Sequence, residues 1–407
     1  MEKKVLLLAK KLESEMVSWR RTLHRNPELS FEEYETTSFI AEKLSEFGCE
    51  NIKIGFGPIS TGLTAEIGSS LPGPAVALRA DIDALPIHEE TNHEWRSCRD
   101  GISHSCGHDA HTAILLAAAS ILSEMKAELK SPVRLIFQPA EERSVPGAEF
   151  KSGAAFVRES GALDGVGAIF GLHVWGDYPA GKICCAKGPV TSAVASFSLE
   201  VNGRGGHGAQ PHFAIDPIMT SCNVASLWQQ IVSREVDAID SLVLTIGKIE
   251  AGTQYNIIPS KAFMEGTCRT LSKETLDFAA KRMEKIASCT CEGMRCTCSF
   301  SFKRGHDSVR NDARAVDIIK KSAEEMFGED SYVTVPPVMV GEDFSLYTDI
   351  IPGALFFLGL GDEAKGTNFG QHHPKFTVND DVISRGAAML ALAALKAANI
   401  FQINKII

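Results

Sequence analysis

The side chains best suited to chemistry gather in one short stretch, residues 103–112, which holds three histidines, a cysteine and an aspartate. Cys106 and His108 are separated by Gly107, which has no side chain and lets the backbone turn tightly. Thiolate and imidazole are ligands of zinc and similar metals. Residues 110–125 are apolar and alanine-rich, which predicts a buried helix directly after this loop. The stretch is either a metal-binding loop braced by a helix, or a helix N-terminus beside histidines that bind nothing.

Acidic and imidazole side chains also follow three short apolar runs, each of which predicts a buried strand. The runs are residues 75–80, 133–138 and 168–172, and the side chains after them are Asp81 and Asp83, Glu141 and Glu142, and His173. Active sites of open α/β sheets lie at the carboxyl ends of strands, so we expect these groups to meet there. Two adjacent glutamates can have different roles, because one can bind a metal ion while the other transfers a proton. The plainer alternatives are an aspartate-rich turn, a surface glutamate pair and a structural histidine.

Helices and strands around these runs indicate an α/β fold with a doubly wound catalytic domain in two segments. The expected helices are residues 17–24, 31–47, 110–125, 313–327 and 384–398, with a further helix opening at 340–345 and a strand at 354–358. We therefore assign residues 1–187 and 303–407 to this domain.

A different pattern lies between these segments and predicts an inserted α+β sandwich, residues 188–302. It reads strand 194–201, helix 216–232, strands 242–249 and 261–269, helix 273–287 and strand 295–303. The glycine-rich loop 203–209 contains His207. This loop is not a phosphate-binding loop, because it lacks the terminal Lys-Ser/Thr and a βαβ setting. Taken alone, His207 is a loop histidine that bonds the adjacent turn.

Composition narrows the class of protein. The 407 residues carry a formal net charge of −10, which argues against a nucleic-acid-binding surface. No apolar run is long enough to span a bilayer or to form the core of a signal peptide, so we expect a cytoplasmic protein without a membrane partner.

Eleven cysteines, an odd number, favour thiols over a disulfide framework. Four of them lie close together in the inserted domain: Cys289, Cys291, Cys296 and Cys298. They are either core residues or a structural zinc site, although paired Cys-x-Cys is a weaker zinc pattern than paired Cys-x-x-Cys. The sequence leaves this choice open.

Together these groups form the ligand and proton-transfer set of a two-metal hydrolase. With these residues the sequence resembles the aminoacylase and carboxypeptidase group of two-metal metallopeptidases. Within that group it is similar to the amidohydrolase branch of hippurate hydrolases, N-acyl-amino-acid amidohydrolases and indole-acetyl-amino-acid hydrolases. The matching stretches are residues 79–86, 104–112, 137–142, 171–174, 205–209, 256–259, 341–345 and 372–374.

The resemblance implies a catalytic domain with an inserted dimerisation, or lid, domain, and hence a homodimer or a higher homo-oligomer. It implies two divalent ions per subunit, Mn²⁺ or Zn²⁺ with Co²⁺ or Ni²⁺ as alternatives. The matching ligands are Cys106, which would bridge the ions, and His108, Glu142, His173 and His372. The choice of His372 over His373 rests on the spacing to Pro374 and stays open.

The resemblance also implies other roles. Glu141 matches the general acid/base, and His207 matches a histidine that approaches the site of the other subunit. Asp83 and His111 are candidates to orient the ligands, and Asn256 and Arg269 are candidates for substrate contact.

The predicted activity is metal-dependent hydrolysis of the amide bond of N-acyl amino acids. The alternatives are a dipeptidase or carboxypeptidase of the same fold, which would act on short peptides, and a non-catalytic metal-binding protein.

Overall fold

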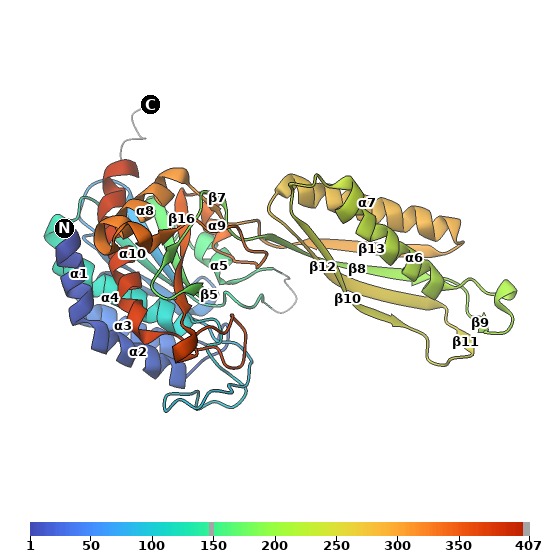
Figure 1. The fold of residues 1–407 in the computed structure, drawn as a ribbon, viewed down its shortest axis with the longest axis horizontal. Coiled ribbons are helices and arrows are strands. Elements are labelled where there is room, and N and C mark those ends of the chain that lie inside the picture. Colours follow the sequence, from blue (N-terminus) through green and yellow to red (C-terminus); the bar gives the residue numbers. More distant parts are fainter. Residues whose placement is uncertain (146–149, 402–407) are drawn as a thin grey trace. The chain divides into compact units, whose positions relative to one another are not determined.

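The computed structural model describes residues 1–145 and 150–401. The chain divides into two compact units, coloured by sequence in Figure 1. The first consists of Met1–Val190, Val309–Pro336 and the chain from Asp343, and the second of Thr191–Ser308 and Pro337–Glu342. The segment 337–342 belongs to the second unit because its backbone pairs there: the Ser192 N–H donates to the Val340 carbonyl at 2.9 Å.

The first unit is built on an eight-stranded mixed sheet. In spatial order the strands are β1 (Glu50–Phe56), β2 (Ile59–Ile67), β4 (Val133–Gln138), β3 (Ala75–Asp81), β5 (Val166–Pro179), β16 (Gly353–Gly361), β6 (Ile183–Cys184) and β15 (Tyr332–Val333). The central strands β4, β3, β5 and β16 are parallel. The expected buried strands therefore form, and their carboxyl ends share one edge.

Helices cover both faces of this sheet, which confirms the predicted α/β class (Figure 1). One face carries α1 (Glu2–Lys11), α2 (Glu13–Arg25), α3 (Tyr34–Glu46), α4 (His108–Glu124), α8 (Ala313–Phe327) and α10 (Ile383–Phe401). The other carries α5 (Gly153–Glu159) and α9 (Ser345–Thr348). Helix α4 is buried on nearly every side, because its alanines let α10 and the sheet approach closely.

Several predicted bounds shift. The helix expected at 31–47 begins only at Tyr34, because Phe31 adopts a positive φ of 70°. The helix expected to open at 340–345 is the four-residue α9. The described chain has no helix long and apolar enough to cross a membrane.

The second unit is a four-stranded antiparallel sheet with two helices. Its strand order is β10 (Leu242–Ala251), β12 (Lys261–Thr270), β8 (Ala193–Asn202) and β13 (Thr297–Arg304). Helices α6 (Pro217–Gln230) and α7 (Lys273–Gly293) share its core, where the fully buried Trp228 donates from Nε1 to the Met283 carbonyl at 2.9 Å. Burial alternates residue by residue along β8, as its sequence predicted.

Minor elements complete the described chain. The paired short strands are β9 (Gly206–His207) with β11 (Ile257–Ile258) and β7 (Gly188–Pro189) with β14 (Arg310–Asn311). The 3₁₀ turns are Lys126–Glu128, Pro211–Phe213, Glu329–Ser331, Glu363–Lys365 and Asp380–Val382, and a π-helical turn, Ile231–Glu235, follows α6.

Candidate metal centre

In the first unit, the register of the parallel strands aligns the predicted site residues at the carboxyl ends of β3 and β4 with His173 of β5. Asp81 is paired with Gln138, and Arg79 is paired with Gly171 two residues before His173. The prediction that a strand ends at His173 is wrong, because β5 continues to Pro179. His173 is nevertheless level with the ends of β3 and β4, because β5 is the longer strand.

Metal-ligating atoms converge at this edge from several segments of the first unit. Five groups in the described chain each have their ligand atoms within 4.8 Å of one another, two of them being Asp81, His108 and His111, and Glu141, Glu342 and Asp343. The other three hold the predicted ligands: Cys106, His108 and His173; Cys106, Glu142 and His372; and His108, Glu141 and Glu142. These three groups share Cys106, His108 and Glu142, so they form one continuous cluster. Its thiol, imidazole and carboxylate donors suit borderline divalent metals.

The two buried imidazoles are oriented for ligation. His173 donates from Nδ1 to the Val174 carbonyl at 2.6 Å, which leaves Nε2 3.5 Å from the Cys106 sulfur. His108 donates from Nδ1 to Asp83 at 3.2 Å, and its buried Nε2 has no hydrogen-bond partner in the described chain. A buried nitrogen left without a partner beside a thiol and carboxylates fits a bound cation.

The backbone between Cys106 and His108 requires glycine. Gly107 has φ +87°, and a Cβ built on it would lie 2.4 Å from Val174 Cγ2. The sequence interpretation of Gly107 as a tight turn therefore agrees with the structure.

Asp83 organises both halves of the cluster. Besides bonding His108, its carboxylate accepts the backbone N–H groups of Glu141 at 3.1 Å and Glu142 at 3.0 Å. Ser30 donates its hydroxyl to the same carboxylate at 2.7 Å. Asp83 thus fixes one imidazole and the turn that carries both glutamates.

His111 has both ring nitrogens engaged. It donates from Nδ1 to Asp81 at 2.5 Å, and its Nε2 accepts the Val174 N–H at 2.8 Å. Burial lowers the pKa of this imidazole, which agrees with a neutral ring that accepts at Nε2. His111 therefore contacts the strand that carries His173 and offers no free lone pair.

The two candidate histidines after Gln371 face different groups. His372 brings Nε2 to 3.1 Å from Glu142, and this hydrogen bond raises the pKa of the imidazole. His373 instead accepts the Lys375 N–H at its Nδ1 and stacks on Phe369. Only His372 of the two belongs to the ligand groups of the described residues.

Electrostatics at the cluster reflect an excess of carboxylates. Burial, with Glu142, Glu141 and Asp81 nearby, raises the pKa of the Cys106 thiol well above its usual range. Burial opposes a charge on His108, but the neighbouring carboxylates outweigh it and raise the pKa of this imidazole to about 10. Divalent cations would relieve this repulsion between like charges.

The remaining predicted site residues lie in the second unit. His207 is exposed on β9, where its Nδ1 accepts the Ala209 N–H. Asn256 is exposed, and its carbonyl accepts the Gly208 N–H at 2.8 Å. Arg269 donates to the Met339 carbonyl at 3.2 Å.

Three of the four clustered cysteines lie in or against the core of the second unit, and Cys289 is exposed. Helix α7 extends to Gly293 rather than ending near 287, so Cys289 and Cys291 are helical, and Cys296 precedes β13. Cys291 and Cys296 are buried in the second core, and Cys298 packs against it. No three of these sulfurs converge in the described part of the chain, which favours the packing interpretation.

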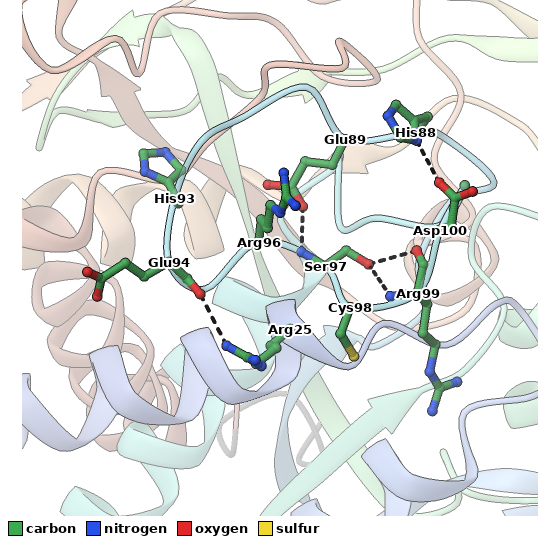
Figure 2. Close-up of a pocket in the computed structure, with 11 residues that line it drawn as sticks. Arg25, His88, Glu89, His93, Glu94, Arg96, Ser97, Cys98, Arg99 and Asp100 are labelled. Atoms are coloured by element: carbon green, nitrogen blue, oxygen red, sulfur yellow. Dashed lines mark hydrogen bonds and ion pairs between the residues drawn. The ribbon is translucent and has the colours of Figure 1, made fainter.

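A polar pocket of about 550 Å³ lies elsewhere in the first unit (Figure 2). The loop of residues 88–101 and Arg25 line it, and none of the predicted site residues does. Glu89 connects it to the metal loop, since Glu89 bonds His24 at 3.2 Å and His24 bonds Asp109 at 2.9 Å.

Sequence reasoning missed the buried carboxylate of Glu33, which accepts the Ala140 N–H at 2.8 Å just before Glu141. In the sequence Glu33 lies within an acidic stretch, residues 28–35, that reads as the start of a helix. No local pattern distinguishes it from its exposed neighbours.

Comparison with known proteins agrees with this geometry. Residues 77–396 match the model of peptidase family M20/M25/M40. The chain is 38% identical to thermostable carboxypeptidase 2 of Saccharolobus solfataricus, over 96% of this chain and 97% of that protein. It is 39% identical to N-acetylcysteine deacetylase of Bacillus subtilis, over 95% of this chain and 97% of that protein.

A solved structure is similar throughout its length. The crystal structure of a Bacillus subtilis protein, described as a dinuclear metal-binding peptidase of the M20 family, has a TM-score of 0.82 and 35% identity. The similarity covers 96% of this chain and 99% of that one. The chain therefore belongs to peptidase family M20/M25/M40 and is a metal-dependent hydrolase of the amidohydrolase and peptidase type.

Proposed function

We propose that this hydrolase cleaves the amide bond of N-acyl amino acids and releases a carboxylic acid and an amino acid. The observation that carries the proposal is the pairing of Glu141 with Glu142 beside His108. One glutamate of such a pair can bind metal while the other moves a proton. The named deacetylase of N-acetylcysteine, and the IAA-amino acid hydrolase ILR1-like 4 of Arabidopsis thaliana at 36% identity, support an acyl-amino-acid substrate.

The proposed ligands of two divalent ions, Mn²⁺ or Zn²⁺, are Cys106, His108, Glu142, His173 and His372. Bound there, the ions would acidify a water molecule and polarise the substrate carbonyl. Asp83 keeps the free nitrogen of His108 directed into the site through its bond to Nδ1. His111 holds the strand that carries His173.

Glu141 is the proposed general acid/base. Its carboxylate takes a proton from the attacking water and later delivers it to the nitrogen of the leaving amino acid. Asp83 accepts the backbone N–H groups of both Glu141 and Glu142, so the two carboxylates are held on one turn. This arrangement separates metal binding from proton transfer.

His207, Asn256 and Arg269 are the proposed contributors from the second unit. We infer that second units of two chains pair and that His207 of one chain stabilises the developing oxyanion in the site of the other. Exposed apolar side chains near His207 support pairing: Tyr255 is 99% exposed, Phe213 65% and Ile257 51%. Asn256 and Arg269 are proposed to bind the substrate carboxylate.

A carboxypeptidase or dipeptidase activity is the second candidate, supported by the relatedness to thermostable carboxypeptidase 2. The test is to strip the enzyme with a chelator and reload it with Mn²⁺, Zn²⁺ or Co²⁺ in separate samples. Each sample then meets a panel of N-acetyl and N-benzoyl amino acids, dipeptides and longer peptides.

The proposal expects kcat/KM for the best N-acyl amino acid to exceed that for the best peptide by ~10-fold or more, a factor that even one methylene contact can supply. A preference for peptides with every metal would reject it in favour of the second candidate.

A further inference from the structure

The turn that carries Glu141 and Glu142 begins in a strained conformation. Ala140 has φ +48°, in the left-handed region that is unfavourable for a residue with a side chain, because Cβ then lies too close to the carbonyl oxygen. The preceding Pro139 has no N–H with which to hold the turn. A strained backbone at a functional site persists only where surrounding contacts impose it.

The contacts around Ala140 involve Glu33, which precedes α3, Thr61 of β2 and Gly153 of α5. Glu33 is 0% exposed, and its Oε1 accepts the Ala140 N–H at 2.8 Å while its Oε2 accepts the Thr61 hydroxyl at 2.7 Å. The Ala140 carbonyl in turn accepts the Gly153 N–H at 2.8 Å. Ala140 is therefore held on both of its peptide groups.

Strand β2 also leaves room for this turn. A Cβ built on Gly62 would lie 2.4 Å from Pro139 Cδ and 2.7 Å from the Phe137 carbonyl oxygen. The absence of a side chain at Gly62 thus allows Pro139 to approach next to the Thr61–Glu33 bond.

The Glu33 carboxylate does not stabilise the start of helix α3. It precedes α3 but makes no side-chain cap there. The first amides of α3 are instead accepted by Glu28, from Glu35 at 3.2 Å and Thr36 at 2.8 Å. Burial and the charge of Asp83 raise the pKa of Glu33 to about 7, although hydrogen bonds from Thr61 and from the Glu33 and Ala140 amides oppose this shift. The carboxyl group therefore occupies a costly position, and its bonds beyond its own residue are those to Ala140 and Thr61.

From these contacts we infer that Glu33 is a positioning residue for the general acid/base. By holding the Ala140 amide it sets the direction in which the chain leaves β4, so that the next two N–H groups meet Asp83 and the Glu141 carboxylate reaches the reacting atoms. This inference rests on the proposed role of Glu141.

The first experiment measures the contact without reference to catalysis. Amide hydrogen exchange of metal-free wild type, Glu33→Ala and Glu33→Gln is followed at Ala140. We expect strong protection in the wild type, loss in Glu33→Ala, and retention in Glu33→Gln, whose amide oxygen can still accept the Ala140 N–H. Unchanged protection in Glu33→Ala would overturn the inference.

The second experiment measures the consequence in the metal-loaded enzyme. Glu33→Ala should lower kcat by ~10–100-fold with KM and metal content near wild type, since small misplacement of a reacting group costs about this much. Glu33→Gln should restore most of the rate. Glu28→Ala is the matched control, a buried carboxylate of the same segment that should lower thermal stability and leave kcat unchanged.

A loss of kcat equal in Glu28→Ala and Glu33→Ala would assign Glu33 a structural role only. If Glu33→Ala does not fold, Thr61→Val removes one of the two bonds and should lower kcat by a smaller factor that Thr61→Ser restores; unchanged kcat in Thr61→Val would then count against the inference. Full turnover in Glu141→Gln would instead overturn the proposed function, while the exchange result would still report on the Glu33–Ala140 contact.

Discussion

Asp83 and His108 are joined at 3.2 Å between carboxylate oxygen and Nδ1, and the same carboxylate accepts the amides that carry Glu141 and Glu142. One buried side chain thus orients a proposed metal ligand and the proposed base. Removing it should disturb metal affinity and proton transfer together.

Asp83→Asn should therefore weaken binding of Mn²⁺ or Zn²⁺ by ~10–100-fold, the usual effect of losing a partner that orients a ligand. Titration calorimetry of the metal-free protein measures this. Asp312→Asn is the control, because Asp312 caps α8 through the Arg314 N–H. Equal affinities in wild type and Asp83→Asn would contradict the assigned orientation.

Glu141→Gln and Glu142→Gln should separate the two carboxylates. The first should keep its metal and lower kcat by at least ~100-fold, the typical contribution of a general base. The second should lose metal affinity, because Glu142 is the proposed ligand. Elemental analysis and steady-state kinetics of the two variants check both statements, and near-normal turnover in metal-loaded Glu141→Gln would reject the mechanism.

The buried pair of His24 and Asp109 predicts a pH-dependent stability. Burial opposes the imidazolium, but Asp109 and Glu89 outweigh it and raise the pKa of His24 to about 9. Because this exceeds the ordinary pKa of about 6.5, the stabilisation is complete below pH ~6.5 and is lost as pH rises through 9.

The loss should be on the order of 3 kcal/mol, since one pKa unit corresponds to about 1.4 kcal/mol. Urea unfolding of the metal-free protein between pH 6 and 10 measures it. His24→Gln should be less stable at pH 6 and should lose the part of the slope that His24 contributes, leaving the part due to His108, whose pKa is also raised. His88→Gln, which removes the exposed pair with Asp100, should keep the wild-type slope. A His24→Gln profile parallel to wild type would contradict the prediction.

His207 should act in the site of the partner chain. Glu141→Gln and His207→Ala are each inactive in this scheme, but a mixed dimer holds one site with both groups intact. Subunit exchange of equal amounts should therefore recover activity, roughly a quarter of the wild-type value for random pairing. Proven exchange without recovery would mean that His207 acts within its own chain or not at all.

The sequence by itself determined the α/β class and most of the proposed ligand set. Helix α4 and the strands β3 and β4 follow from apolar runs of the right length, and side chains at the ends of parallel strands must share an edge. The tight turn at Gly107 could also be predicted from the sequence, because only a residue without a side chain fits there. These features depend on local pattern and on rules that apply to every parallel sheet.

Tertiary structure alone decided which polar groups meet. Both ring nitrogens of His111 are hydrogen-bonded, to Asp81 and to the Val174 N–H. His372 rather than its neighbour His373 faces Glu142, although the two histidines are adjacent and alike in the sequence. Glu33 was indistinguishable from its acidic neighbours until the fold brought it to Ala140. The physical reason is that a hydrogen bond depends on distance and direction between groups far apart in the chain, and local propensity carries no information about either.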